Sequence, residues 1–216
     1  MSILERAIFI HGVGEGWPPD SVQNYWPLMT QLTKVPILFE YHEELNKSKK
    51  RWLARALVGL TWLKLFTADA SEDVVGWVGD KKAREIISAK LRKCLMAEAE
   101  LLEGVFAHSL GTVVLLEALQ GLPEEDLEQL RKTTEIHIVG SPLHLFTFRL
   151  SAMFNDYNIK VLKGFKVHIH AGSRDPIAAF GNSWLAKKVL KYNVRFHLHD
   201  TSHDFKEYLQ GIINNA

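Results

Sequence analysis

The sequence predicts a three-layer α/β fold, in which a mainly parallel sheet of about six strands lies between layers of helices. Short apolar runs without alternation, such as Ala7-Ile8-Phe9-Ile10, are typical of strands buried on both faces. Longer segments separate such runs, and in them apolar residues recur at helical spacing, most clearly over 83–95. Strands that alternate with helices along the chain favour a parallel sheet over an antiparallel one.

The strand-like segments, in chain order, are 7–10, 35–41, 101–106, 135–139, 164–172 and 194–200. Helices are expected from the turn at 17–21 to about residue 32, and over 73–100, 112–119, 124 onward and 205–213. Asp80 is expected to cap the second of these helices or to lie in its first turn. Cys94 falls on the apolar stripe of the same helix, which favours a small core residue over a nucleophile.

Composition favours one domain and limits the kinds of partner. The chain has 216 residues, of which 47% are hydrophobic, so residues 1–216 are expected to form a single domain. Lysine and arginine total 26 against 25 acidic residues, so no basic field points to nucleic acid. A single cysteine fits a reducing compartment, and residues 1–6 show no basic-then-apolar leader. We therefore expect a cytoplasmic protein.

A lid-like insert is expected at about 46–72. Residues 47–66 combine a basic head with an apolar body that contains Trp52 and Trp62, and the uncharged stretch between Arg55 and Lys64 is too short to span a bilayer. Three interpretations remain: a cap over an active site, an interfacial helix on a membrane, and a core helix with a solvated cationic end. The first two favour an apolar substrate.

The stretch Ala107-His108-Ser109-Leu110-Gly111 carries the clearest chemical signal. It follows an apolar strand-like run and precedes a helix-like one, so Ser109 falls where a strand turns abruptly into a helix. A serine in this setting occupies a strained turn that lifts its hydroxyl clear of the sheet, and small neighbours let the strand and the helix approach. The pattern is small-x-Ser-x-Gly, with Ala107 at the first small position.

This motif resembles the nucleophile elbow of the α/β-hydrolase superfamily, and the resemblance extends from Ile8 to Phe205. It implies a three-layer hydrolase fold that lacks the first two strands of the superfamily. It also implies a catalytic triad in the order Ser109, Asp175 and His203, because Asp175-Pro176 follows one late strand and His203 follows the last.

The same resemblance implies the remaining site residues. The His11-Gly12 turn after the first strand would begin an oxyanion loop, with the backbone amides of Val13 and Leu110 as donors. His11, Gly12 and His108 are expected around the serine and the substrate. From the insert, Trp62 is expected at the substrate as well.

Rival residues can be weighed from the sequence. Ser141 also ends a strand, but Pro142 cannot donate an N–H to an oxyanion, so Ser141 is expected at the rim. Asp200 is an alternative acid, although an aspartate three residues before His203 can seldom face its imidazole.

The histidines within strands are expected on sheet faces. His168, His170, His197 and His199 have a spacing that could imitate a metal pair, but no carboxylate cluster with metal spacing accompanies them. The serine chemistry implied by the resemblance requires no metal and no organic cofactor, and none is expected.

These features predict a serine hydrolase, lipase-like or esterase-like, that cleaves a carboxylic ester of an apolar acyl group. A thioesterase or an acyltransferase would use the same residues. A hypothesis from another class is a catalytically silent hydrolase-fold module that binds a membrane or a protein through the basic-apolar insert. The expected partner is a small acyl ester, with peripheral membrane contact through 47–66 kept open and the oligomeric state undetermined.

Overall fold

Six parallel strands form one sheet in the computed structural model, which describes residues 3–12, 19–42, 44, 77, 80–142, 159–175 and 193–215. The strand order is β2-β1-β3-β4-β5-β6, and every neighbouring pair is parallel. The strands are β1 (Leu4–Ile10), β2 (Thr33–Phe39), β3 (Leu102–His108), β4 (Glu135–Val139), β5 (Lys166–Gly172) and β6 (Val194–His199). The predicted fold class is confirmed: β1 is an interior strand, and no antiparallel strand joins the sheet in the described part of the chain.

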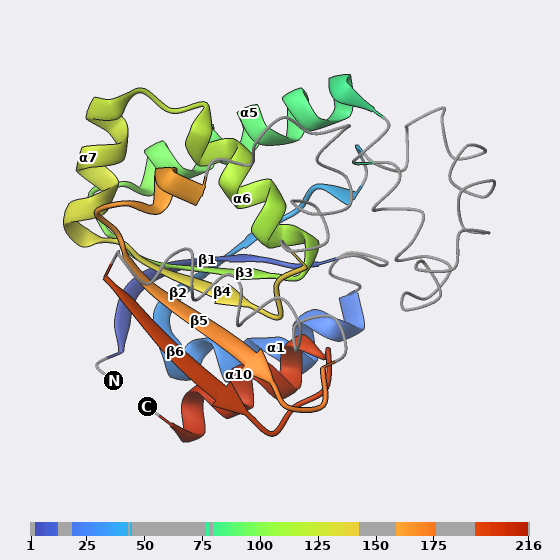
Figure 1. Ribbon diagram of the computed structural model, residues 1–216. Helices are drawn as coiled ribbons and strands as arrows, with labels where there is room; N and C mark the ends of the chain where they lie inside the picture. The colour runs from blue at the N-terminus through green and yellow to red at the C-terminus, as the bar shows by residue number, and fades with distance from the viewer. Residues whose placement is uncertain are drawn as a thin grey trace.

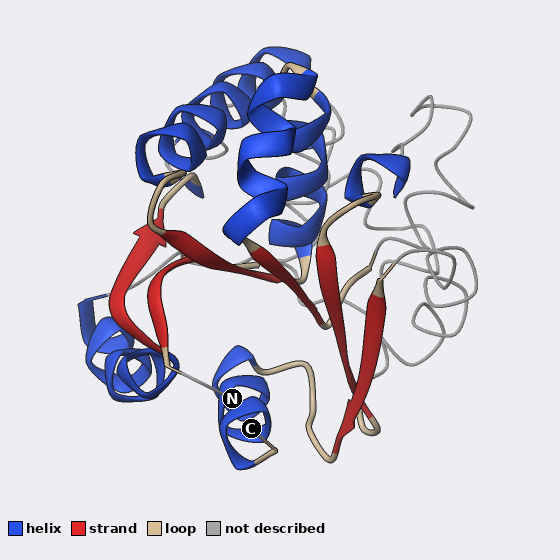
Figure 2. Cartoon of the chain, turned by 90° about the vertical axis from the view of Figure 1, so that its left-hand side faces the viewer, coloured by secondary structure: helices blue, strands red, loops and turns tan. Residues whose placement is uncertain are grey.

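Helices cover both faces of the sheet, as Figures 1 and 2 show. On one side lie α5 (Lys81–Glu98), α6 (Leu110–Gln120), α7 (Glu124–Thr133) and the short 3₁₀ helix η2 (Ile159–Leu162). The other side carries α1 (Pro19–Leu32) and α10 (Phe205–Asn214). The three layers follow from the apolar strands, because a sheet that is hydrophobic on both faces must be covered on both.

Two apolar clusters fill the spaces between the layers. The larger joins α5 and α6 to strand residues such as Ile8, Val105 and Ile138. The smaller joins α1 and α10 to the opposite strand face, where Phe9 stacks on Phe106 with ring centroids 4.9 Å apart. Alternate residues of one strand therefore enter different clusters, since successive side chains point to opposite faces.

Some predicted boundaries were wrong. The second strand covers 33–39 rather than 35–41, and Tyr41 lies beyond it, where its hydroxyl donates to the carbonyls of His11 (2.9 Å) and Gly12 (2.8 Å). The third strand continues to His108, so that Ser109 follows it directly. α5 is shorter than predicted, but Asp80 caps it, with its carboxylate accepting from the Ala83 amide at 3.0 Å.

Several predictions fall outside the described residues: the insert at about 46–72, the membrane contact through 47–66, Trp62 and Val13. Across the ranges that the structure describes, none of the helices has the length and apolar character needed to cross a bilayer.

Candidate active site

Ser109 forms a strained turn between β3 and α6. Its φ is 51° and its ψ is −123°, and it is the one non-glycine residue with positive φ in the described part of the chain. Such a backbone is costly for an L-residue and persists where the surroundings fix it. Here the Ser109 amide donates to the Val139 carbonyl of β4 at 2.9 Å. The turn has the strand-to-helix geometry that the motif predicted.

Two glycines let the neighbouring backbone approach this turn. A Cβ at Gly111 would lie 2.7 Å from the carbonyl oxygens of both Ile10 and His11, at the end of β1. At Gly12 a Cβ would lie 2.6 Å from the Ser109 Cβ. The loop after β1 is therefore in contact with the serine, as expected for His11-Gly12.

A chain of hydrogen bonds joins Ser109, His203 and Asp175. His203 Nε2 lies 2.9 Å from Ser109 Oγ, and His203 Nδ1 lies 2.8 Å from Asp175 Oδ2. The carboxylate can only accept, so Nδ1 carries a proton and, in the neutral ring, Nε2 has a lone pair directed at the serine hydroxyl. The three residues follow β3, β5 and β6, and they meet because parallel strands end at a common edge.

Asp175 is fully buried and receives a second donor, Tyr208 of α10. The Tyr208 hydroxyl donates to Oδ2 at 2.6 Å, the same oxygen that accepts from His203. Burial, and then the hydrogen bond to Asp175, raise the pKa of Tyr208 far above its usual range, so it remains a donor. Sequence reasoning missed Tyr208, whose only signal is its place on the apolar stripe of the last helix.

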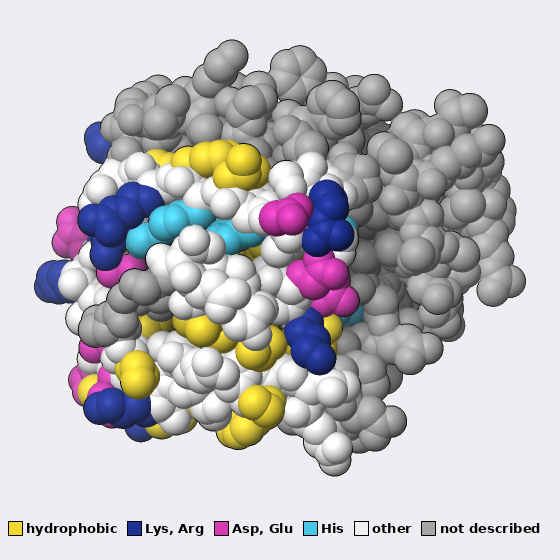
Figure 3. Space-filling model, turned by 90° about the horizontal axis from the view of Figure 1, so that it is seen from below, with side chains coloured by type: hydrophobic (Ala, Val, Ile, Leu, Met, Phe, Trp, Pro, Cys, Tyr) yellow, Lys and Arg dark blue, Asp and Glu magenta, His cyan; other side chains and the backbone are white. Residues whose placement is uncertain are grey.

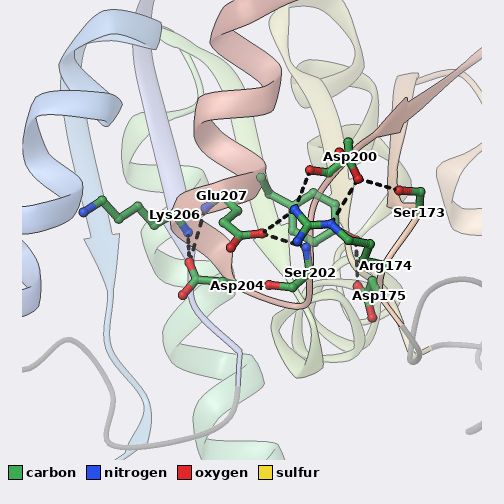
Figure 4. A network of polar contacts seen from close by, with 9 residues as sticks. Ser173, Arg174, Asp175, Asp200, Ser202, Asp204, Lys206 and Glu207 are labelled. Atoms are coloured by element: carbon green, nitrogen blue, oxygen red, sulfur yellow. Dashed lines mark hydrogen bonds and ion pairs between the residues drawn. The ribbon is translucent and has the colours of Figure 1, made fainter.

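Asp200, the alternative acid, belongs to an exposed polar network instead (Figure 4). Its Oδ1 accepts from Ser173 Oγ and Arg174 Nε, each at 3.0 Å. These hydrogen bonds lower the pKa of Asp200, and Arg174 also approaches Glu207 at 3.8 Å. In this structure the imidazole of His203 pairs with Asp175.

Ser141, the rival nucleophile, is buried and lies beside Thr112 of α6. The two hydroxyl oxygens are 2.9 Å apart, and the Thr112 hydroxyl also lies 2.7 Å from the Ser109 carbonyl, to which it can donate. Thr112 therefore connects the elbow backbone to the end of β4. Sequence reasoning did not single it out.

His11 and His108 pack as neutral rings around the site. The His108 ring stacks on Phe205 at 4.9 Å and lies 4.9 Å from the His203 ring, while His11 contacts His108 edge-on at 5.8 Å. Burial, with His42 as the next cause, lowers the pKa of His11 to about 4. Burial, and then His203, lower the pKa of His108 well below its ordinary value. Neither ring therefore carries a charge that would compete with His203 at neutral pH.

Of the predicted oxyanion donors, Leu110 is the first residue of α6 and follows Ser109 directly. Helix N-termini present unpaired backbone amides and favour negative charge. The Ser109 side chain makes no capping hydrogen bond to α6 and is directed to His203 instead. The partner donor, Val13, lies outside the described residues.

Comparison with known proteins gives a distant likeness in structure. The chain matches no family model and no curated protein sequence. Among solved structures it is similar to a dienelactone hydrolase from Anabaena variabilis, with 14% identity and a TM-score of 0.48 over 99% of this chain and 84% of that one. At this level the likeness assigns neither a family nor an activity to the chain.

Proposed function

We propose that the protein is a serine hydrolase that cleaves a carboxylic ester, or a thioester, of an apolar acyl substrate. The supporting observation is the unbroken path from Ser109 Oγ through His203 to Asp175, with steps of 2.9 and 2.8 Å. A hydroxyl is a weak nucleophile at neutral pH, and an adjacent base that removes its proton activates it.

In the proposed mechanism His203 Nε2 takes the Ser109 proton as Oγ attacks the substrate carbonyl. Asp175 holds the ring in the required tautomer and stabilises the imidazolium that forms. The Leu110 amide, with Val13 as second donor, stabilises the oxyanion. His203 then protonates the leaving group, and a water activated by the same imidazole releases the acyl group from Ser109. A positioned base of this kind contributes about 10²–10⁴-fold in rate.

The preference for an apolar acyl group rests on the composition of the insert at 46–72, and no described residue bears on it. Membrane contact through 47–66 and the silent binding module rest on the same insert, and a cytoplasmic location rests on the single cysteine and on residues 1–6. These remain predictions. No residue of the proposed triad needs a cofactor for this chemistry.

The test is labelling of the purified protein with a fluorophosphonate, followed by hydrolysis of p-nitrophenyl esters of increasing chain length. We expect Ser109→Ala to abolish labelling and to lower the ester hydrolysis rate by at least about 10³-fold. An unlabelled wild-type protein that binds liposomes would favour the silent module instead.

A matched pair of variants tests which aspartate, Asp175 or Asp200, is the acid of the proposed triad. Asp175→Asn should lower the rate by about 10⁴-fold, because the asparagine amide favours the wrong imidazole tautomer. Asp200→Asn removes a similar side chain three residues from His203 and should leave the rate within about twofold, since exposed ion pairs contribute little. Equal losses in the two variants would contradict the assignment of Asp175.

A further inference from the structure

Five histidines on three neighbouring strands form what we call the histidine ladder: His137 of β4, His168 and His170 of β5, and His197 and His199 of β6. Spacing of two residues puts each pair on one face of its strand. This face is the one that α10 covers, since His199 lies 6.2 Å from the Tyr208 ring. Figure 3, which views the molecule from this side, shows histidine side chains reaching the surface as a narrow band.

The rings of the ladder are stacked and hydrogen-bonded diagonally from strand to strand. His137 Nδ1 lies 3.1 Å from His170 Nε2, and His170 Nδ1 lies 2.9 Å from His199 Nε2. A parallel contact of 3.0 Å joins His168 Nδ1 to His197 Nε2. Imidazole nitrogens from different strands are thus already brought within contact distance of one another.

The ladder contains a buried nitrogen atom that makes no hydrogen bond within the described part of the chain and is available to a ligand. His137 is 1% exposed, and its Nε2 has no hydrogen-bond partner among the described residues. Burial of such an atom without a partner is costly. A neutral imidazole nitrogen in such a place is a common ligand of a metal ion.

We propose that His137, His168 and His170 form a binding site for one divalent transition-metal ion of the zinc class. One ring nitrogen from each lies within 4.8 Å of those of the other two. Tetrahedral coordination with Zn–N bonds of about 2.0–2.1 Å requires the nitrogens to lie roughly 3.3–3.4 Å apart. Binding therefore requires the rings to turn toward a common point, and three histidines with one open position are a donor set that zinc uses.

Neighbouring groups fit the outer shell that such a site needs. Metal-binding histidines usually donate their second N–H to a carboxylate or a similar acceptor. His168 Nε2 lies 3.1 Å from Glu135 Oε2, a carboxylate that Lys166 also contacts, but makes no hydrogen bond among the described residues. A turn of the ring on metal binding would let this N–H donate to Glu135 and direct Nδ1 to the ion. His197 Nε2 lies 3.0 Å from His168 Nδ1, and the His197 ring is only partly buried, so it can turn away or become the fourth ligand.

Serine chemistry does not require this site. The experiment uses untagged full-length protein, freed of metal by a chelator and titrated with Zn²⁺ by calorimetry and with Co²⁺ by visible absorption. We expect one ion per chain and the intense absorption of tetrahedral Co²⁺. His168→Gln and His170→Gln should each weaken binding by more than about 100-fold, beyond the 10–100-fold cost of losing an outer-shell partner.

His203→Gln is the matched control, because it removes a histidine at the serine and should leave metal binding unchanged. His170→Gln should still be labelled by a fluorophosphonate if the serine site is active, and circular dichroism checks its fold. Should His170→Gln not fold, His168→Gln carries the same test. The proposal is overturned if the protein binds neither ion, if both ladder variants bind as well as wild type, or if His203→Gln abolishes binding.

Discussion

Two donors share one oxygen of Asp175. His203 Nδ1 at 2.8 Å and the Tyr208 hydroxyl at 2.6 Å both lie on Oδ2, in a place from which solvent is excluded. A buried carboxylate without such partners would favour its neutral form and lose its hold on the imidazole. We therefore regard Tyr208 as a positioning residue, which acts on the serine through Asp175 and His203.

Tyr208→Phe tests this role while it keeps the aromatic ring in the apolar layer. A hydrogen bond to a charged group is worth about 1.5–3 kcal/mol, so kcat should fall by about 10- to 150-fold. KM should change little, because Tyr208 is placed behind the acid rather than at the substrate. Steady-state kinetics with a p-nitrophenyl ester measures both. An unchanged kcat in a folded variant would show that Tyr208 has only a packing role.

At the scale of elements, the position of the nucleophile depends on how closely α6 approaches the end of β1. Gly111, in the first turn of α6, lies against the carbonyls of Ile10 and His11, both of which are backbone atoms that cannot turn aside. At the other end of the helix, the three atoms nearest to a Cβ at Gly121 would all belong to the Arg92 side chain, which is flexible. The two ends therefore differ in what an added methyl group would displace.

Gly111→Ala should lower the free energy of unfolding by about 1–3 kcal/mol, the usual cost of overpacking, and should shift Ser109 enough to reduce the hydrolysis rate. Gly121→Ala is the matched control, since the φ of Gly121 is −89° and Arg92 can move; we expect near-wild-type stability and rate. Urea denaturation and ester kinetics on both variants make the comparison. Similar losses at the two positions would argue against close packing at the elbow as the cause.

At the scale of the whole molecule, the parallel sheet gathers the site at one edge. Titratable rings are buried at this edge. The segments around residues 11, 109, 175 and 203 come from different parts of the chain and meet beside the strand ends. His11 and His108 are buried there as neutral imidazoles, His11 next to His42 and His203, and His108 next to His203. The folded protein therefore binds protons at these two rings less readily than the unfolded chain does.

The lowered pKa values of His11 and His108 predict a loss of stability in acid. Both histidines have folded pKa values below the ordinary 6.5, so below that pH the unfolded chain binds more protons than the folded one. The free energy of unfolding should fall as pH drops from 6.5 to about 4, the folded pKa of His11. Each ring contributes up to about 1.4 kcal/mol per pH unit.

Urea denaturation at several pH values, with a chelator present, measures this slope. His108→Gln removes one of the buried rings and should make the dependence shallower by roughly one proton. The comparison is between the slopes of the free energy of unfolding against pH, so a general loss of stability in the variant does not obscure the result. A free energy of unfolding that stays constant from about pH 6.5 to 5 would contradict the assignment of neutral buried rings.

Local sequence patterns were sufficient to predict the secondary-structure elements and the strand-to-helix turn at Ser109. Continuous apolar runs identified the strands, and small residues on either side of Ser109 identified a strand-to-helix turn. The errors lie at the ends of elements. The second strand starts two residues earlier than predicted because Thr33 pairs with Leu4 of β1, which a search for apolar runs cannot detect. Backbone pairing, rather than side-chain character, decides where a strand stops.

The sequence by itself determined the α/β class and the site of the strained serine, because these depend on local sterics and hydrophobic period. The order Ser109, Asp175 and His203 was implied by the resemblance of the motifs to those of the α/β hydrolases. Only the tertiary structure decided the spatial strand order, the pairing of His203 with Asp175 rather than Asp200, the place of Tyr208 and the joining of His137 to the other ladder histidines. Ser109 and His203 are 94 residues apart. Contacts over such separations depend on which strands pair and in what register, and no local pattern encodes that choice.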